Sequence, residues 1–143
     1  MVHALQEAHR VLKPGGILID LRPATEHRRL GLGEGRRWKV LGRFREPLDE
    51  DRPANAAVAR VVREGYFREE IRRQFLLDRV MDTVDDFRDW LADFSSRSKL
   101  PSHAFLLKRL EQRVSRLRKP VKITVRGHMT LGILIKLDPA DRT

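Results

Sequence analysis

A helix stop followed at once by a strand pattern is the feature that most constrains the fold. From Val2 to Leu12, apolar residues recur at helical spacing with charged residues between them, which predicts an amphipathic helix. Pro14 and the pair Gly15-Gly16 end that helix. The run Ile17 to Leu21 then has the length and apolar character of a strand covered on both faces in a parallel sheet. Helix, tight turn and buried strand make up half of an α/β unit.

The rest of the chain alternates in the same way between extended and helical patterns. Residues 22–53 read as a variable, polar segment that includes an acidic linker, Pro47 to Pro53, and a short strand or hairpin over Arg37 to Phe44 with Trp38, Val40 and Leu41 inward. The later expected elements are a helix from Ala54 to a C-cap at Gly65, a strand over Phe67 to Val80 with Ile71, Phe75 and Leu77 in its inner row, a helix capped by Thr83, a break at Ser95 to Ser98, a helix over Pro101 to Leu117, and one bent strand or two short strands over Val121 to Leu137.

The stretch from Ala4 to Ile19, which contains Arg10-Val11-Leu12-Lys13-Pro14-Gly15-Gly16, resembles a region of class I S-adenosylmethionine-dependent methyltransferases. In that family the region leads from a helix into the fifth strand. The resemblance implies an α/β fold class: a partial Rossmann-like methyltransferase fold with the fifth to seventh strands and flanking helices. We therefore expect residues 1–143 to form a single truncated methyltransferase-like domain, made of a helix-turn-strand unit (2–21), the variable segment (22–53), and the helix, strand, helices and final strand of 54–137.

The resemblance assigns no cofactor site. In the family, a glycine-rich loop after the first strand and an acidic residue ending the second strand hold S-adenosylmethionine, and both precede the matched region. We therefore expect no catalytic, cofactor-binding or metal-binding residue and no cofactor for this chain alone. Gly31 to Gly35 is rich in glycine, but it follows Arg28-Arg29 instead of a hydrophobic strand and leads into Arg36 to Trp38 instead of a helix, so we do not expect it to bind a nucleotide.

Polar residues after the first strand are the candidate contacts for an anion or a substrate, because ligands of open α/β sheets bind beyond the carboxyl ends of the strands. These candidates are Arg22, His27, Arg28 and Arg29. For Arg22 a salt bridge to a neighbouring acid is the favoured alternative, and for the other three a solvated loop. His103 and His128 have no histidine or carboxylate at metal-ligand spacing, so we expect them to be structural or exposed.

Composition narrows the function classes. The absence of cysteine excludes disulfides, thiolate zinc sites and cysteine nucleophiles. No apolar run has the length of a signal peptide or a membrane span, so we expect a cytoplasmic protein without membrane contacts. The net charge of +10 favours a nucleic-acid or polyanion partner, although a GC-rich genome or a thermophilic source is an alternative origin of this arginine-rich charge. Few residues are aromatic, which argues against base stacking, but the basic faces of the helix over Pro101 to Leu117 and of Arg36-Arg37 suit phosphate contacts.

Three functions remain open. The favoured one is a methyltransferase-like protein that lacks the cofactor-binding half and has no independent activity, so whether the chain is an enzyme stays uncertain. The alternatives are a basic nucleic-acid or polyanion binding module, and a subunit that completes a split methyltransferase. In the full fold Ile17 to Leu21 has a neighbour that is absent here, which predicts an apolar strand edge. We expect a homodimer through this edge, or its pairing with a missing N-terminal half, and only weak nucleic-acid binding.

Overall fold

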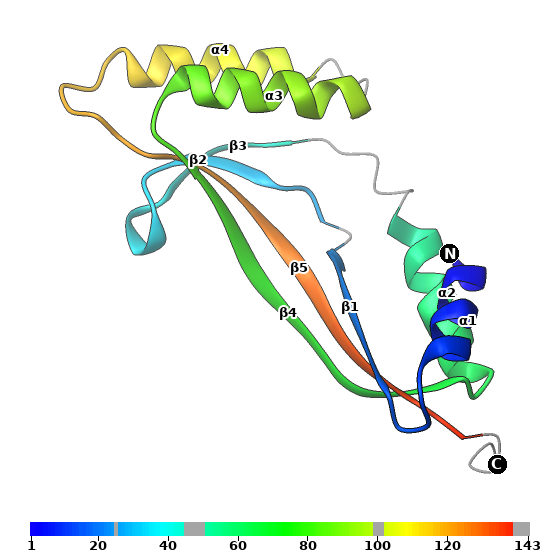
Figure 1. The fold of residues 1–143 in the computed structure, drawn as a ribbon. Coiled ribbons are helices and arrows are strands. Elements are labelled where there is room, and N and C mark those ends of the chain that lie inside the picture. Colours follow the sequence, from blue (N-terminus) through cyan, green and yellow to red (C-terminus); the bar gives the residue numbers. More distant parts are fainter. Residues whose placement is uncertain (25, 45–50, 99–101, 139–143) are drawn as a thin grey trace. The chain divides into compact units, whose positions relative to one another are not determined.

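The computed structural model describes residues 1–24, 26–44, 51–98 and 102–138. Within these ranges the chain is a mixed α/β protein with four α-helices and an antiparallel sheet of five strands (Figure 1). In chain order the elements are α1 (Val2–Val11), β1 (Ile17–Pro23), β2 (Arg29–Leu32), the 3-10 turn η1 (Gly35–Arg37), β3 (Lys39–Arg43), α2 (Asp51–Arg63), β4 (Phe67–Met81), α3 (Val84–Ser98), α4 (Ser102–Val114) and β5 (Ile123–Lys136).

The chain forms two compact units. Unit 1 comprises residues 1–25, 48–75 and 128–143, and unit 2 comprises residues 26–47 and 76–127. Strands β4 and β5 each supply residues to both units. The expected helices and the expected final strand are confirmed, with β5 as one long strand. Of the expected acidic linker, residues 47–50 lie outside the described ranges, and Asp51 already belongs to α2.

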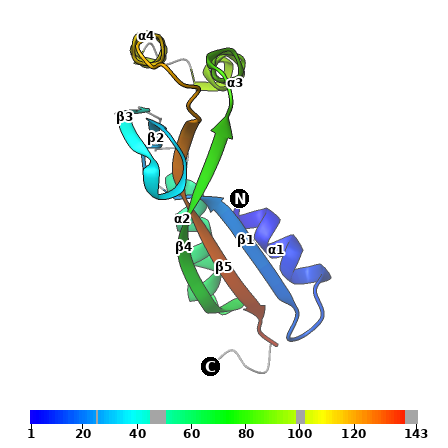
Figure 2. The same cartoon turned by 90° about the vertical axis from the view of Figure 1, so that its left-hand side faces the viewer.

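In unit 1, strands β1, β5 and β4 lie side by side (Figure 2). Strand β1 pairs antiparallel with β5, with Leu18 opposite Leu134. These two residues pack with Val61 of α2 and with Leu5 of α1, so both helices cover the same face of the sheet. His9 of α1 lies between the apolar positions of the sequence pattern, but it is buried. Its ring makes edge-to-face contacts with the rings of Tyr66 and Phe67. One face of this sheet therefore has a helical layer and a core.

The expectation that Ile17 to Leu21 is covered on both faces in a parallel sheet is wrong. The strand is antiparallel to β5, and its burial alternates from residue to residue. Ile17, Ile19 and Leu21 are 59%, 65% and 57% exposed. The physical reason is that α1 and α2 supply one layer only, so side chains that point away from these helices meet no second layer within the part of the chain that the structure describes.

In unit 2, β2 lies between β3 and β5, and both pairings are antiparallel. Strand β2 is an addition to the expected elements. Helices α3 and α4 lie side by side (Figures 1 and 2) and close over the β2–β3 hairpin. The core of the unit is built on large, fully buried side chains, among them Leu30, Phe44, Phe87 and Leu110.

The start of α3 follows the sequence pattern, whereas its end does not. The Thr83 hydroxyl accepts a hydrogen bond from the Asp86 amide (3.0 Å), and the Asp86 carboxylate accepts one from the Thr83 amide (2.9 Å). This reciprocal cap satisfies two backbone donors that the first turn leaves open. The Thr83 hydrogen bond also lowers the pKa of Asp86. The predicted break at Ser95 to Ser98 is wrong, because α3 continues through Ser98.

Three predicted inward side chains are also exposed. Val40 of β3 is 51% exposed, whereas its neighbour Leu41 packs against the core. The β2–β3 pairing shifts register between Leu30 and Gly31, and such a bulge changes which side chains face inward. On β4, Phe75 and Leu77 are 40% and 53% exposed, since no layer among the described residues covers this stretch of the strand.

Candidate anion-binding site

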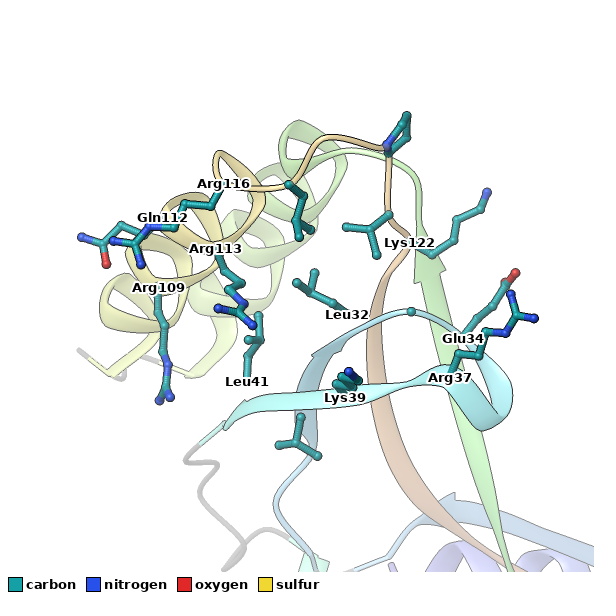
Figure 3. A pocket seen from close by; sticks show the side chains of 15 residues that line it. Leu32, Glu34, Arg37, Lys39, Leu41, Arg109, Gln112, Arg113, Arg116 and Lys122 are labelled. Atoms are coloured by element: carbon teal, nitrogen blue, oxygen red, sulfur yellow. The ribbon is translucent and has the colours of Figure 1, made fainter.

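A cationic face of α4 forms one wall of a cavity in unit 2. Leu106 and Leu110 of this helix are buried in the core, which fixes how the helix is turned. Arg109 and Arg113 are four residues apart on one side of the helix, Arg116 follows just beyond the helix end, and all three line the cavity. Figure 3 shows Arg109 and Arg113 extending from α4 toward strand β3.

The β2–β3 hairpin and the segment that leads into β5 form the rest of the cavity, which has a volume of about 850 Å³ (Figure 3). Its floor is apolar, and Leu32, Leu41 and Val121 belong to the unit 2 core or pack against it. Glu34 is the one acidic residue among the described lining residues. Six are basic: Arg37, Lys39, Arg109, Arg113, Arg116 and Lys122. The cavity is therefore an electropositive site that favours anions.

Most of these cations have no counter-ion among the residues that the structure describes. Within the described part of the chain, no carboxylate forms an ion pair with Arg37, Lys39, Arg109, Arg113 or Arg116. Lys122 differs, because the Asp82 carboxylate accepts its hydrogen bond and raises the pKa of the Lys122 ammonium. Five positive charges around one cavity are thus available to a ligand.

Two hydrogen bonds, one between backbone groups and one from a side chain, hold the turn of the hairpin against β5. The amide of Gly33 donates to the carbonyl of Lys122 (2.7 Å), and the Thr124 hydroxyl donates to the carbonyl of Gly33 (2.6 Å). Gly33 has a φ of +92°, which favours glycine. A side chain at Gly31 would place its Cβ 2.3 Å from Trp38 Nε1, so glycine is required there for packing. The glycines of Gly31 to Gly35 thus have structural roles.

Arg126 of β5 ties the same hairpin to β4. Its guanidinium donates two hydrogen bonds to the Asp78 carboxylate (2.6 and 2.7 Å) and lies 4.3 Å from the centre of the Trp38 ring. The hydrogen bonds from Arg126 hold the pKa of the Asp78 carboxyl below its usual range, and the carboxylate raises the pKa of Arg126. The paired, half-buried Arg126 supports the hairpin without lining the cavity, whereas Arg109, Arg113 and Arg116 line it.

The four candidate residues from the sequence lie elsewhere. Arg22, in unit 1, pairs with Asp20 (2.7 Å) and donates to the side chain of Asn55, so the salt-bridge alternative is confirmed. The other three belong to unit 2: His27 is exposed, whereas Arg28 and Arg29 are half-buried. None of the four lines the cavity.

The sequence indicated part of the site. It singled out the basic face of the α4 segment and Arg36-Arg37, of which Arg37 lines the cavity. It gave no signal for Lys39 or Lys122, because these residues reach the cavity through strand pairing between distant segments. His103 is buried against the Phe44 ring, with ring centres 5.6 Å apart, in agreement with a structural role. No group of three or more candidate metal ligands occurs among the described residues.

Comparisons with protein-family models, with curated proteins and with solved structures find no match for the chain. Within the described ranges, none of the helices combines the length and the apolar character that crossing a membrane requires. Function is therefore inferred from the sequence, the fold and the site.

Proposed function

We propose that the chain is a cytoplasmic, methyltransferase-like protein, and that residues 1–143 alone neither bind S-adenosylmethionine nor transfer methyl groups. The observation that supports this most is the layer formed by β1, β5 and β4 with α1 and α2 on one face. These are the strands that the family resemblance equates with the fifth to seventh strands of a Rossmann-like sheet. In such a fold they are the part that follows the cofactor site in sequence.

The turn between α1 and β1 fits the same proposal as an element of the fold. Gly15 has a φ of +71°, its amide donates to the carbonyl of Lys136 (3.2 Å), and the Lys136 ammonium donates to the carbonyl of Leu12 (2.6 Å). The turn is thus bonded to the end of β5, at the amino end of β1. Ligands of open α/β sheets bind at the carboxyl ends of the strands, so this turn contributes to structure and not to chemistry.

Calorimetric titration with S-adenosylmethionine tests the proposal, with an intact class I methyltransferase as the positive control. We expect no measurable binding of S-adenosylmethionine, because we assign no cofactor-binding residue to residues 1–143. A stoichiometric complex of micromolar affinity would contradict the proposal.

We further propose that β1 pairs through its free edge, with a second copy of this chain as the preferred partner. The Gly16 carbonyl accepts a hydrogen bond from the Lys136 amide (2.8 Å), and the Ala24 amide donates one to the His128 carbonyl (2.9 Å). Both partners belong to β5, so by antiparallel alternation the even-numbered residues of β1 face β5. The amides of Ile17, Ile19 and Leu21 then point to the open edge, beside exposed aliphatic side chains. Antiparallel pairing of two such edges produces a continuous sheet. A separate subunit that completes a split methyltransferase is the alternative partner.

Sedimentation of the Ile19→Pro and Ile19→Thr variants tests this pairing. We expect the wild type to be a dimer at micromolar concentration and proline to abolish it, because proline removes the outward amide. Threonine keeps that amide, so Ile19→Thr should remain dimeric. A monodisperse wild-type monomer would contradict the homodimer and favour the separate subunit.

Binding of a nucleic acid or another polyanion is a second candidate function, which the distribution of charge favours. Unit 2 contains 19 basic and 10 acidic residues, a net charge of +9, whereas unit 1 contains 11 and 10, a net charge of +1. A salt titration of binding to mixed oligonucleotides tests it. We expect weak binding whose affinity falls as the salt concentration rises, and undetectable binding at low salt would remove the candidate.

A further inference from the structure

We infer that the cavity of unit 2 binds a compact ligand with two or more phosphate groups. The inference rests on the polyanion-binding function proposed above and names its ligand class. Its starting point is the five cations that line one cavity without a carboxylate partner among the described residues. Other exposed cations outside the cavity, such as Arg63 and Arg79, also have no carboxylate partner among the described residues, so the distinctive feature here is that five such cations line one cavity.

The positions of the cations call for more than one phosphate. Arg109 and Arg113 line the cavity from α4, about 6 Å apart along the helix axis, and Arg116 lines it from the turn that follows the helix. Arg37 and Lys39 line it from the hairpin. A single phosphate engages one such group of donors, whereas linked phosphates contact both walls at once. Guanidinium groups also match phosphate oxygens in a bidentate geometry.

The size and the floor of the cavity favour a small ligand over a polymer. A volume of about 850 Å³ is in the range of cavities that enclose small molecules. The apolar floor of Leu32, Leu41 and Val121 provides a surface for the uncharged body of such a ligand. No aromatic side chain occurs among the described lining residues, so the cavity lacks the stacking platform typical of single-stranded nucleic-acid sites.

The wall opposite α4 is held in place without a ligand. The Gly33 amide donates a hydrogen bond to the Lys122 carbonyl, and the Gly33 carbonyl accepts one from the Thr124 hydroxyl. The guanidinium of Arg126 lies over the Trp38 ring of the hairpin. A preformed wall reduces the ordering cost of binding. The described lining residues therefore combine cations that have no carboxylate partner among them with a hairpin that hydrogen bonds hold in place.

Calorimetry with inorganic tripolyphosphate as the probe tests the inference on the whole chain. We expect a 1:1 complex at low salt that inorganic phosphate does not reproduce at the same concentration. The variant Arg109→Gln/Arg113→Gln should bind tripolyphosphate about 100-fold more weakly, since each lost charge-assisted contact weakens binding about tenfold. Lys108→Gln is the matched control: it removes one exposed charge from the same helix outside the cavity lining, and we expect a change of less than about threefold.

A short single-stranded oligothymidylate forms the second arm of the experiment. If it binds with an affinity that increases with length while tripolyphosphate does not bind, polyanion binding stands and the compact ligand is refuted. If neither probe binds at low salt, both proposals fail. Equal affinities of the wild type and the double-glutamine variant for tripolyphosphate would also overturn the inference, because binding would then occur outside the cavity. Circular dichroism of each variant separates loss of contacts from loss of fold.

Discussion

Unit 1 and unit 2 differ in how they use charge and apolar surface. Unit 1 is nearly neutral, and five arginines, at positions 10, 22, 60, 68 and 72, pair with neighbouring acids. Its sheet nevertheless leaves an aliphatic row exposed on β1. Unit 2 carries almost all of the net charge and gathers unpaired cations around an apolar-floored cavity. This difference underlies our proposals that unit 1 contacts a protein partner and that unit 2 binds an anion.

The largest expected effect comes from the core that supports the cavity. Phe87 is fully buried between α3 and its neighbours in unit 2. Phe87→Ala should lower the free energy of unfolding by about 3–5 kcal/mol and abolish tripolyphosphate binding, because the walls of the cavity lose their common support. Chemical denaturation and calorimetry measure the two effects.

Phe105→Ala is the control for this substitution. Phe105 lies on α4 but is 67% exposed, so its removal should change stability by no more than about 0.5 kcal/mol. Equal destabilisation by both substitutions would contradict the packing described for unit 2.

The Asp78–Arg126 pair gives a smaller effect with a defined pH dependence. Asp78→Asn should lower the free energy of unfolding by about 1–2 kcal/mol at neutral pH, because the side chains are only partly exposed and two charge-assisted hydrogen bonds weaken. The hydrogen bonds from Arg126 depress the folded-state pKa of Asp78 below its usual value of 3.8. Its contribution is therefore complete above about pH 4 and is lost as the pH falls through the depressed pKa.

Denaturation of the wild type and Asp78→Asn from pH 2.5 to pH 7 measures this dependence. The difference between the two proteins should shrink as the solution is acidified below about pH 4. Glu7→Gln, which removes an exposed pair in unit 1, should change little across the range. A difference between the wild type and Asp78→Asn that does not change with pH would exclude the ion pair as its cause.

The smallest effect concerns the cap of α3. Thr83→Ala should reduce stability by about 1 kcal/mol, because the amide of Asp86 loses its hydrogen-bond acceptor. Thr83→Ser keeps the hydroxyl and should restore most of this loss. Chemical denaturation checks both variants, and equal stabilities of the alanine and serine variants would show that the cap contributes nothing measurable.

Local patterns in the sequence predicted the structural features that depend mainly on residues close together in the chain. The turn at Pro14 to Gly16, the cap at Thr83 and the salt bridge of Arg22 each involve contacts within a few residues or a strong local preference. The spacing of Arg109, Arg113 and Arg116 likewise predicted a basic helix face. These features appear in the structure where the pattern placed them.

Properties that depend on distant partners were not predictable in this way. Ile17 to Leu21 has the composition of a buried strand, but its exposure depends on which layers cover it. His9 occupies a charged position in the helical pattern and is buried because Tyr66 and Phe67 come from another part of the chain. Lys39 lines the same cavity as the arginines of α4 because of how the hairpin pairs and where its register shifts. Pairing and register, which the sequence pattern leaves open, determine the site.

Backbone amide resonances of a ¹⁵N-labelled sample test most directly the claim that ligand binding resides in unit 2. Titration with tripolyphosphate should shift resonances of residues 32–41 and 109–122 and leave residues 17–23 unchanged, and S-adenosylmethionine should shift none. Shifts centred on β1, or saturable shifts on addition of S-adenosylmethionine, would contradict this account.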